Sequence, residues 1–174
     1  MMNLIVTCAR HLEGETENEL IDILDELGDS DVTISVSSMS GIITVQTKLD
    51  PIEVVRKMKE MLLDEPWSIR YCLRVIPVQK IVETNIEEIE KIISSISNQI
   101  KEKESYRILI EKRNSDISSK EIITKIASNI KNKVSLDFPD KVILIEILGI
   151  VTGISILKKS DILSLEKTKR SMSD

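Results

Sequence analysis

Three consecutive polar residues, Lys112, Arg113 and Asn114, form the most promising anion-binding motif of the sequence. They follow a strand-like apolar segment and precede a capped helix that starts near Ser119. Arg113 suits a bidentate phosphate contact, Lys112 a point-charge contact, and Asn114 a hydrogen bond to phosphate, sugar or a base edge. The free N–H groups of the helix N-terminus would reinforce this anion site. An ordinary solvated loop is the alternative interpretation.

Four further cationic residues are secondary candidates for contact with a polyanion. Lys158 and Lys159 end the last apolar segment, where the alternative is an ordinary strand terminator. Arg74 and Lys80 flank Pro77 and are expected to face a cleft between two modules. Alternatively, Arg74 pairs with one of the many carboxylates of the first half.

The distribution of charge supports a polyanion site in the second half of the chain. The net charge of −5 by itself argues against a nucleic-acid binder. Residues 1–100, however, carry 9 Lys or Arg against 18 Asp or Glu, a balance of −9. Residues 101–174 carry 15 against 11, a balance of +4. Since binding depends on the local field, the basic half is where a polyanion is expected to dock.

Catalytic motifs find little support in the sequence. His11 is the single histidine, and two cysteines with one histidine do not make a convincing zinc site. No serine stands beside a recognisable base, and the glycines of Gly149-x-x-x-Gly153 lie between apolar strands, unlike those of a phosphate-binding loop. We therefore expect a protein without catalytic activity, metal or cofactor. The short apolar segments and the lack of a basic leader predict a cytoplasmic location.

The first half of the chain has the β-α-β-β-α-β order of a ferredoxin-like module. Thr16 and Glu19 predict a capping box for a helix that ends at Gly28. Asp50 followed by Pro51 predicts the start of the second helix, and Ser68–Ile76 the fourth strand. The second half reads as α-β-α-β-β. The expected fold class is α+β, with a ferredoxin-like module at 1–77, an α/β domain at 78–165 and a basic tail at 166–174.

Three segments of the second half resemble the THUMP domain. The first is Arg74-Val75-Ile76-Pro77-Val78, which precedes an acidic amphipathic helix. The second is Ile110-Glu111-Lys112-Arg113-Asn114, which leads into the capped helix. The third is Val134 to Asp140, which leads to Ile143-x-Ile145-Glu146-Ile147. With the preceding ferredoxin-like module, the resemblance covers essentially the whole chain.

The resemblance implies an RNA-binding function. Most family members attach these modules to a methyltransferase, a thiouridine synthetase or a pseudouridine synthase. Because this chain ends at Asp174, it is most similar to the stand-alone adaptor required for N4-acetylcytidine formation in tRNA. That adaptor type implies binding of tRNA at its acceptor stem and 3′ end and its delivery to a separate tRNA cytidine acetyltransferase.

Two other functions remain open from the sequence. One is the RNA-binding subunit of a split tRNA thiolation or methylation enzyme, which needs the same basic face. The other is a ferredoxin-like sensor or assembly module without an RNA role, against which the charge asymmetry argues.

Overall fold

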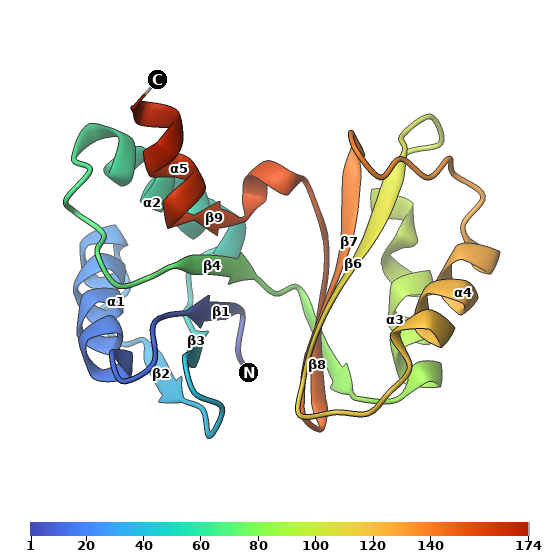
Figure 1. Cartoon of the computed structure of the whole chain (residues 1–174), viewed down its shortest axis with the longest axis horizontal. Helices are drawn as coiled ribbons and strands as arrows, with labels where there is room; N and C mark the ends of the chain where they lie inside the picture. The colour runs from blue at the N-terminus through green and yellow to red at the C-terminus, as the bar shows by residue number, and fades with distance from the viewer. Residues whose placement is uncertain (174) are drawn as a thin grey trace. The chain divides into compact units, whose positions relative to one another are not determined.

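The computed structural model describes residues 1–173, which form two compact units (Figure 1). Unit 1 combines Met1–Val78 with the C-terminal segment from Ser160, and unit 2 spans Gln79–Lys159. The C-terminal boundary therefore differs from the sequence-based division at residue 165. Residues from Ser160 onward belong to unit 1 because a short strand of this segment pairs with the first sheet and Leu165 is buried in its core.

Unit 1 contains a five-stranded sheet in the order β2-β3-β1-β4-β9. All neighbouring strands are antiparallel, and β1 lies in the centre between β3 and β4. The strands are β1 (Leu4–Thr7), β2 (Thr33–Val36), β3 (Ile42–Gln46), β4 (Arg74–Pro77) and β9 (Leu163–Ser164). The expected β-α-β-β-α-β order and the α+β class are confirmed, with β9 as an addition at the edge.

Three helices complete unit 1: α1 (Glu13–Leu27), α2 (Pro51–Asp64) and α5 (Leu165–Met172). Helices α1 and α2 bury their apolar stripes against the sheet, where Leu20, Met58 and Leu62 are inaccessible to solvent. Asp50 caps α2 as predicted, because its carboxylate accepts the N–H groups of Ile52 and Glu53. The expected basic tail is instead the helix α5, with its first residue in the core.

The predicted capping box of α1 is wrong. The helix begins at Glu13, three residues before Thr16, and the Thr16 hydroxyl donates to the Leu12 carbonyl at 2.6 Å. Glu19 instead accepts backbone N–H groups from Arg70, Tyr71 and Cys72 at 2.8–3.0 Å. These N–H groups are thus taken by a carboxylate and not by a neighbouring strand, which explains why β4 starts only at Arg74.

A buried carboxylate just after α1 bonds to the residues that follow β3. Asp29 is 1% exposed, and one of its oxygens accepts from the Thr47 hydroxyl at 2.5 Å and from Lys48 N–H at 2.9 Å. The bond from Thr47 is the main cause that lowers the pKa of Asp29 below its ordinary 3.8. A lowered pKa means that the ionised form stabilises the fold above the unfolded-state pKa, and that this contribution is lost as the pH falls through the folded-state pKa.

We therefore expect Asp29→Asn to lower the free energy of unfolding at pH 7 by about 2 kcal/mol, since an amide accepts less well at these donors. The difference from the unsubstituted protein should begin to shrink below the unfolded-state pKa of about 4 and disappear as the pH falls through the lower folded-state pKa of Asp29. Urea unfolding of the variant and of the unsubstituted protein, at pH 7 and again below about pH 4, measures the difference in unfolding free energy. Asp31→Asn, an exposed neighbour, is the control; a difference that stays constant with pH would contradict the assignment.

Unit 2 contains a four-stranded sheet in the order β5-β8-β7-β6. The central strands β7 (Lys141–Leu148) and β8 (Val151–Leu157) are antiparallel, whereas β6 (Tyr106–Arg113) runs parallel to β7. The edge strand β5 (Lys80–Glu83), which the sequence did not predict, is antiparallel to β8. Its four residues are too few to show a clear alternation of apolar and polar side chains. The segment is a strand because it pairs with β8.

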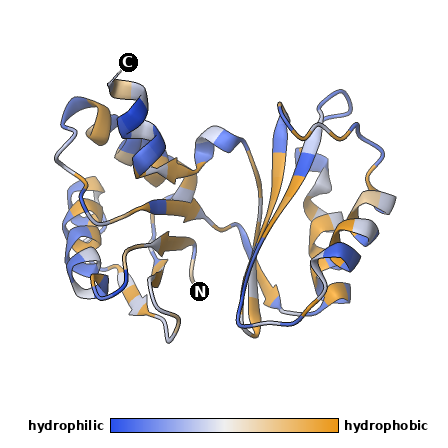
Figure 2. Cartoon of the chain, in the orientation of Figure 1, coloured by the Kyte–Doolittle hydropathy of each residue, from blue (hydrophilic) through white to orange (hydrophobic). Residues whose placement is uncertain are grey.

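Two helices, α3 (Ile86–Ile96) and α4 (Ser119–Asn129), lie over one face of the second sheet (Figure 1). Their isoleucines pack on the alternate residues Ile143, Ile145 and Ile147 of β7. Asn85 and Ser118 cap the two helices, and the capped helix predicted near Ser119 is confirmed. The strands of this sheet are orange over most of their length and blue near their ends in Figure 2. A polar ligand is therefore expected to bind at an end of this sheet, where the hydrophilic side chains lie.

No helix within residues 1–173 combines the length and the apolar character needed to cross a membrane. The same part of the chain holds no group of three or more His, Cys, Asp or Glu side chains arranged to bind a metal ion.

Candidate nucleic-acid interface

The predicted motif Lys112-Arg113-Asn114 lies at the carboxyl end of β6, and its arginine is engaged within unit 2. Arg113 Nη1 donates to Glu146 Oε2 at 3.2 Å, and the side chains are 28% and 1% exposed. The buried carboxylate thus neutralises the guanidinium that the sequence suggested for a phosphate. This ion pair joins the parallel strands β6 and β7.

The two neighbours of Arg113 are exposed but also serve local structure. Lys112 Nζ donates to the Ile117 carbonyl at 2.9 Å. Asn114 has a left-handed backbone with φ +54°, which starts the turn towards α4. Ser118 already accepts the N–H of Glu121 at the helix N-terminus, so part of the predicted anion site is occupied by the protein itself.

The surroundings of this motif are acidic. We define the acidic end of the second sheet as residues 83–88, 111–121 and 146–151. The strand register brings these segments to the same end of the sheet. It carries three Lys or Arg against seven Asp or Glu, a balance of −4. A phosphate backbone approaching Lys112 therefore meets an unfavourable field.

The opposite end of the sheet gathers cations from three separate parts of the chain. We define the basic end as residues 101–107, 131–141, 158 and 159. The amide of Asn132 donates to the Lys101 carbonyl at 2.7 Å and to that of Glu104 at 3.0 Å, which ties the two loops together. Tyr106 lies beside Lys141 in the register, and Leu157, next to Lys158, pairs with Val142.

The basic end carries eight Lys or Arg against four Asp or Glu, a balance of +4. Its exposed cations are Lys101, Lys103, Lys131, Lys133, Lys158 and Lys159. Lys141 is already paired with Glu104 at 2.8 Å, and this bond lowers the pKa of the carboxylate. The remaining cations adjoin the ends of three neighbouring strands, so an extended polyanion could contact several of them.

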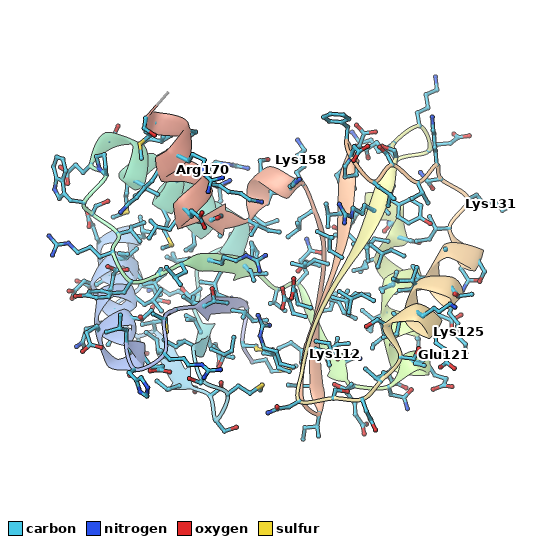
Figure 3. All side chains as sticks on the ribbon, viewed as in Figure 1. Lys112, Glu121, Lys125, Lys131, Lys158 and Arg170 are labelled. Carbon is cyan, nitrogen blue, oxygen red and sulfur yellow. The ribbon has the colours of Figure 1, made fainter. Side chains whose placement is uncertain are left out.

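The seven predicted site residues therefore do not form one group. Lys158 and Lys159 lie at the basic end, and Lys80 starts β5 towards the same end, opposite Ile154. The positions paired with Arg113 and Leu157 are Leu148 and Val142, six residues apart on β7, or roughly 20 Å. Figure 3 shows Lys112 and Lys158 near opposite ends of the second sheet. Arg74 belongs to unit 1, half-buried at the start of β4.

The basic end also exposes apolar side chains that the sequence did not single out. Val134, Leu136 and Phe138 alternate along the loop before β7 and are 50%, 65% and 88% exposed. Arg107 supports this loop by donating to the Leu136 carbonyl at 2.9 Å. An exposed aromatic ring among lysines suits stacking on an unpaired base. The only sequence signal for this group is the repeated Lys-x-Lys at 101–103 and 131–133, which are about 30 residues apart and meet only in the fold.

Part of unit 2 matches the model of a known protein family. The family model of the THUMP domain matches residues 83–157. An uncharacterized protein of Methanocaldococcus jannaschii, MJ0421, is 26% identical over 174 residues, which cover 97% of this chain and 44% of that protein. This chain thus spans less than half the length of that relative.

Solved structures share the fold of both modules. PH1313 from Pyrococcus horikoshii has a TM-score of 0.64 at 20% identity, over 91% of this chain and 55% of its own. TrmN from Thermus thermophilus has a TM-score of 0.63 at 13% identity, over 90% and 45%. A 4-thiouridine synthetase, solved in complex with RNA and bound ATP, has 0.54 at 12%, over 91% and 42%. The resemblance to the THUMP domain is thereby confirmed for residues 83–157, in a fold of ferredoxin-like module plus THUMP domain.

Proposed function

We propose that this chain binds tRNA for a tRNA-modifying enzyme and that the basic end of unit 2 makes the main contacts. The observation that carries this proposal is the group of six exposed lysines at the basic end, which also exposes Phe138, in a unit that matches the THUMP domain. A similar fold in the 4-thiouridine synthetase was solved with RNA. Lysine ammonium groups supply salt-dependent contacts to phosphates, and the aromatic ring supplies a surface for a base.

The finer proposal is an adaptor role without catalysis by these residues. In this role the chain presents tRNA to a tRNA cytidine acetyltransferase for N4-acetylcytidine formation. The described residues offer binding groups at the basic end, and His11, the single histidine, lies in unit 1. This proposal assigns the catalytic step to the partner.

A second candidate is an RNA-binding part of a thiolation or methylation enzyme. The similar folds of a 4-thiouridine synthetase and of a putative methyltransferase complexed with SAH favour it. Scanning modified nucleosides in a deletion strain separates the candidates. Loss of N4-acetylcytidine supports the adaptor, whereas loss of a thiolated or methylated base supports the second candidate.

The binding step is tested by a filter-binding titration with whole tRNA at about 50 mM and about 200 mM salt. Four phosphate contacts predict a slope of about −3 in log affinity against log salt concentration. The expected result is binding at low salt that weakens steeply as salt rises. Absence of binding at the lower salt concentration would favour the sensor or assembly module without an RNA role.

A further inference from the structure

Unit 1 contains an open groove of about 710 Å³ that the RNA-binding proposal does not use. Its walls are one face of α1, the end of α2 and the loop that leads to β4. The carboxylates that line it are Glu15, Glu19, Asp22, Glu26, Asp64 and Glu65, and the one cation is Arg70. Trp67 and Tyr71 supply aromatic surface. We call this feature the Trp67 groove.

The charge of the groove is concentrated on α1. Glu15, Glu19, Asp22 and Glu26 follow the spacing i, i+4, i+7 and i+11, so they share one face of the helix. The helix contains seven acidic residues and no Lys or Arg. Like charges three or four positions apart destabilise a helix by about 0.2–0.5 kcal/mol per pair. Glu15 lies in the first turn, where the helix dipole favours an acidic residue, and Glu19 anchors the backbone of residues 70–72. Asp22 and Glu26 gain neither contribution, and the last turn carries no basic residue.

Most of these carboxylates are available to a ligand. Glu19 is committed to the backbone of residues 70–72. Across residues 1–173, no hydrogen bond or ion pair is found for the side chains of the other five. All five of these side chains, and that of Trp67, are exposed to solvent.

The aromatic wall of the groove is held in place by its loop. Trp67, the single tryptophan of the chain, is 64% exposed. The loop around it is fixed by Glu19, by Glu65 N–H to the Met61 carbonyl at 2.8 Å and by Ser68 N–H to the Glu65 carbonyl at 2.9 Å. On another side of Trp67, a second depression is lined by Pro66, Lys169 and Met172. An exposed, positioned tryptophan between two hollows is typical of a residue that dominates an interface.

We propose that the Trp67 groove docks a Lys- or Arg-rich peptide segment of a protein partner. A cationic side chain stacks on the Trp67 ring, and the remaining cations lie along the carboxylate stripe of α1. The charge of the groove excludes a nucleic acid, whose phosphates it repels. This proposal does not depend on RNA binding at the basic end, and it assigns unit 1 a separate ligand of opposite charge.

The test uses a synthetic peptide of about twelve residues with alternating Arg and Gly, added to the whole chain. Trp67 is its own reporter, because no other tryptophan contributes to the fluorescence. We expect saturable quenching of this fluorescence, with binding also followed by the polarisation of a dye on the peptide. Trp67→Ala should weaken the binding about tenfold by polarisation, as expected for loss of a cation–π contact. No saturable binding up to about 1 mM peptide would overturn the proposal.

Two adjacent residues of α1 supply a matched pair of variants. Glu26 lines the groove and Asp25, also exposed, does not. Glu26→Lys should weaken peptide binding at least about fivefold, whereas Asp25→Lys, with the same change of charge, should change it less than about twofold. Equal losses would show only general attraction to an acidic protein and would overturn the site. Two results would overturn the assignment of a peptide ligand. One is that spermine displaces the peptide at a concentration equal to that of the peptide, and the other is that tRNA alone quenches the fluorescence of Trp67.

Discussion

Replacing Lys131 and Lys133 together with alanine is expected to weaken tRNA binding roughly 30- to 100-fold at about 0.1 M salt. Both side chains are exposed at the basic end, on the loop that Asn132 joins to residues 101–104. Two lost phosphate contacts should also reduce the magnitude of the salt slope by about 1.5. Filter binding at several salt concentrations measures both quantities.

The matched control is Lys112→Ala with Lys120→Ala, which removes two exposed lysines from the acidic end. We expect less than about a threefold loss of affinity for this pair, since the local balance of −4 already opposes RNA there. A larger loss of tRNA affinity in the Lys112 and Lys120 variant than in the Lys131 and Lys133 variant would instead place the interface at the Lys112-Arg113-Asn114 motif that the sequence favoured. Similar losses in both pairs would indicate attraction without a defined site.

Arg113→Ala is expected to lower the free energy of unfolding of unit 2 by about 3 kcal/mol, because it leaves the buried Glu146 carboxylate without this cation. Glu146 is 1% exposed and lies in the central strand β7. Amide hydrogen exchange of β7 reports the change, since its protection follows the opening free energy of the sheet.

Arg113→Lys separates the contribution of the positive charge from that of the guanidinium geometry. It keeps the positive charge but loses the planar guanidinium, so about half of the stability should return. RNA binding by Arg113→Lys should stay within about threefold of the unsubstituted chain, because the assigned contacts lie at the other end of the sheet. Wild-type protection in Arg113→Ala together with weak RNA binding would identify Arg113 as a contact residue after all.

Local sequence signals predicted local structure well in this chain. The cap at Asp50 and the capped helix near Ser119 are confirmed because a side chain and an N–H two or three residues away decide them. The same reasoning failed at Thr16 and Glu19, although the residue types match a capping box. Glu19 binds N–H groups 51 to 53 residues away, and no local pattern contains that information.

The sequence by itself determined the order of the main elements, without β5, β9 and α5, together with the apolar strands of both units and the basic balance of the second half. These follow from periodicity, caps and charge, which are properties of neighbouring residues. Only the tertiary structure decided which charges act together. The parallel pairing of β6 with β7 places Arg113 beside Glu146 and sends the Lys101 and Lys131 loops to the opposite end. A binding surface is a sum over residues that are close in space, and their separation in sequence does not reveal it.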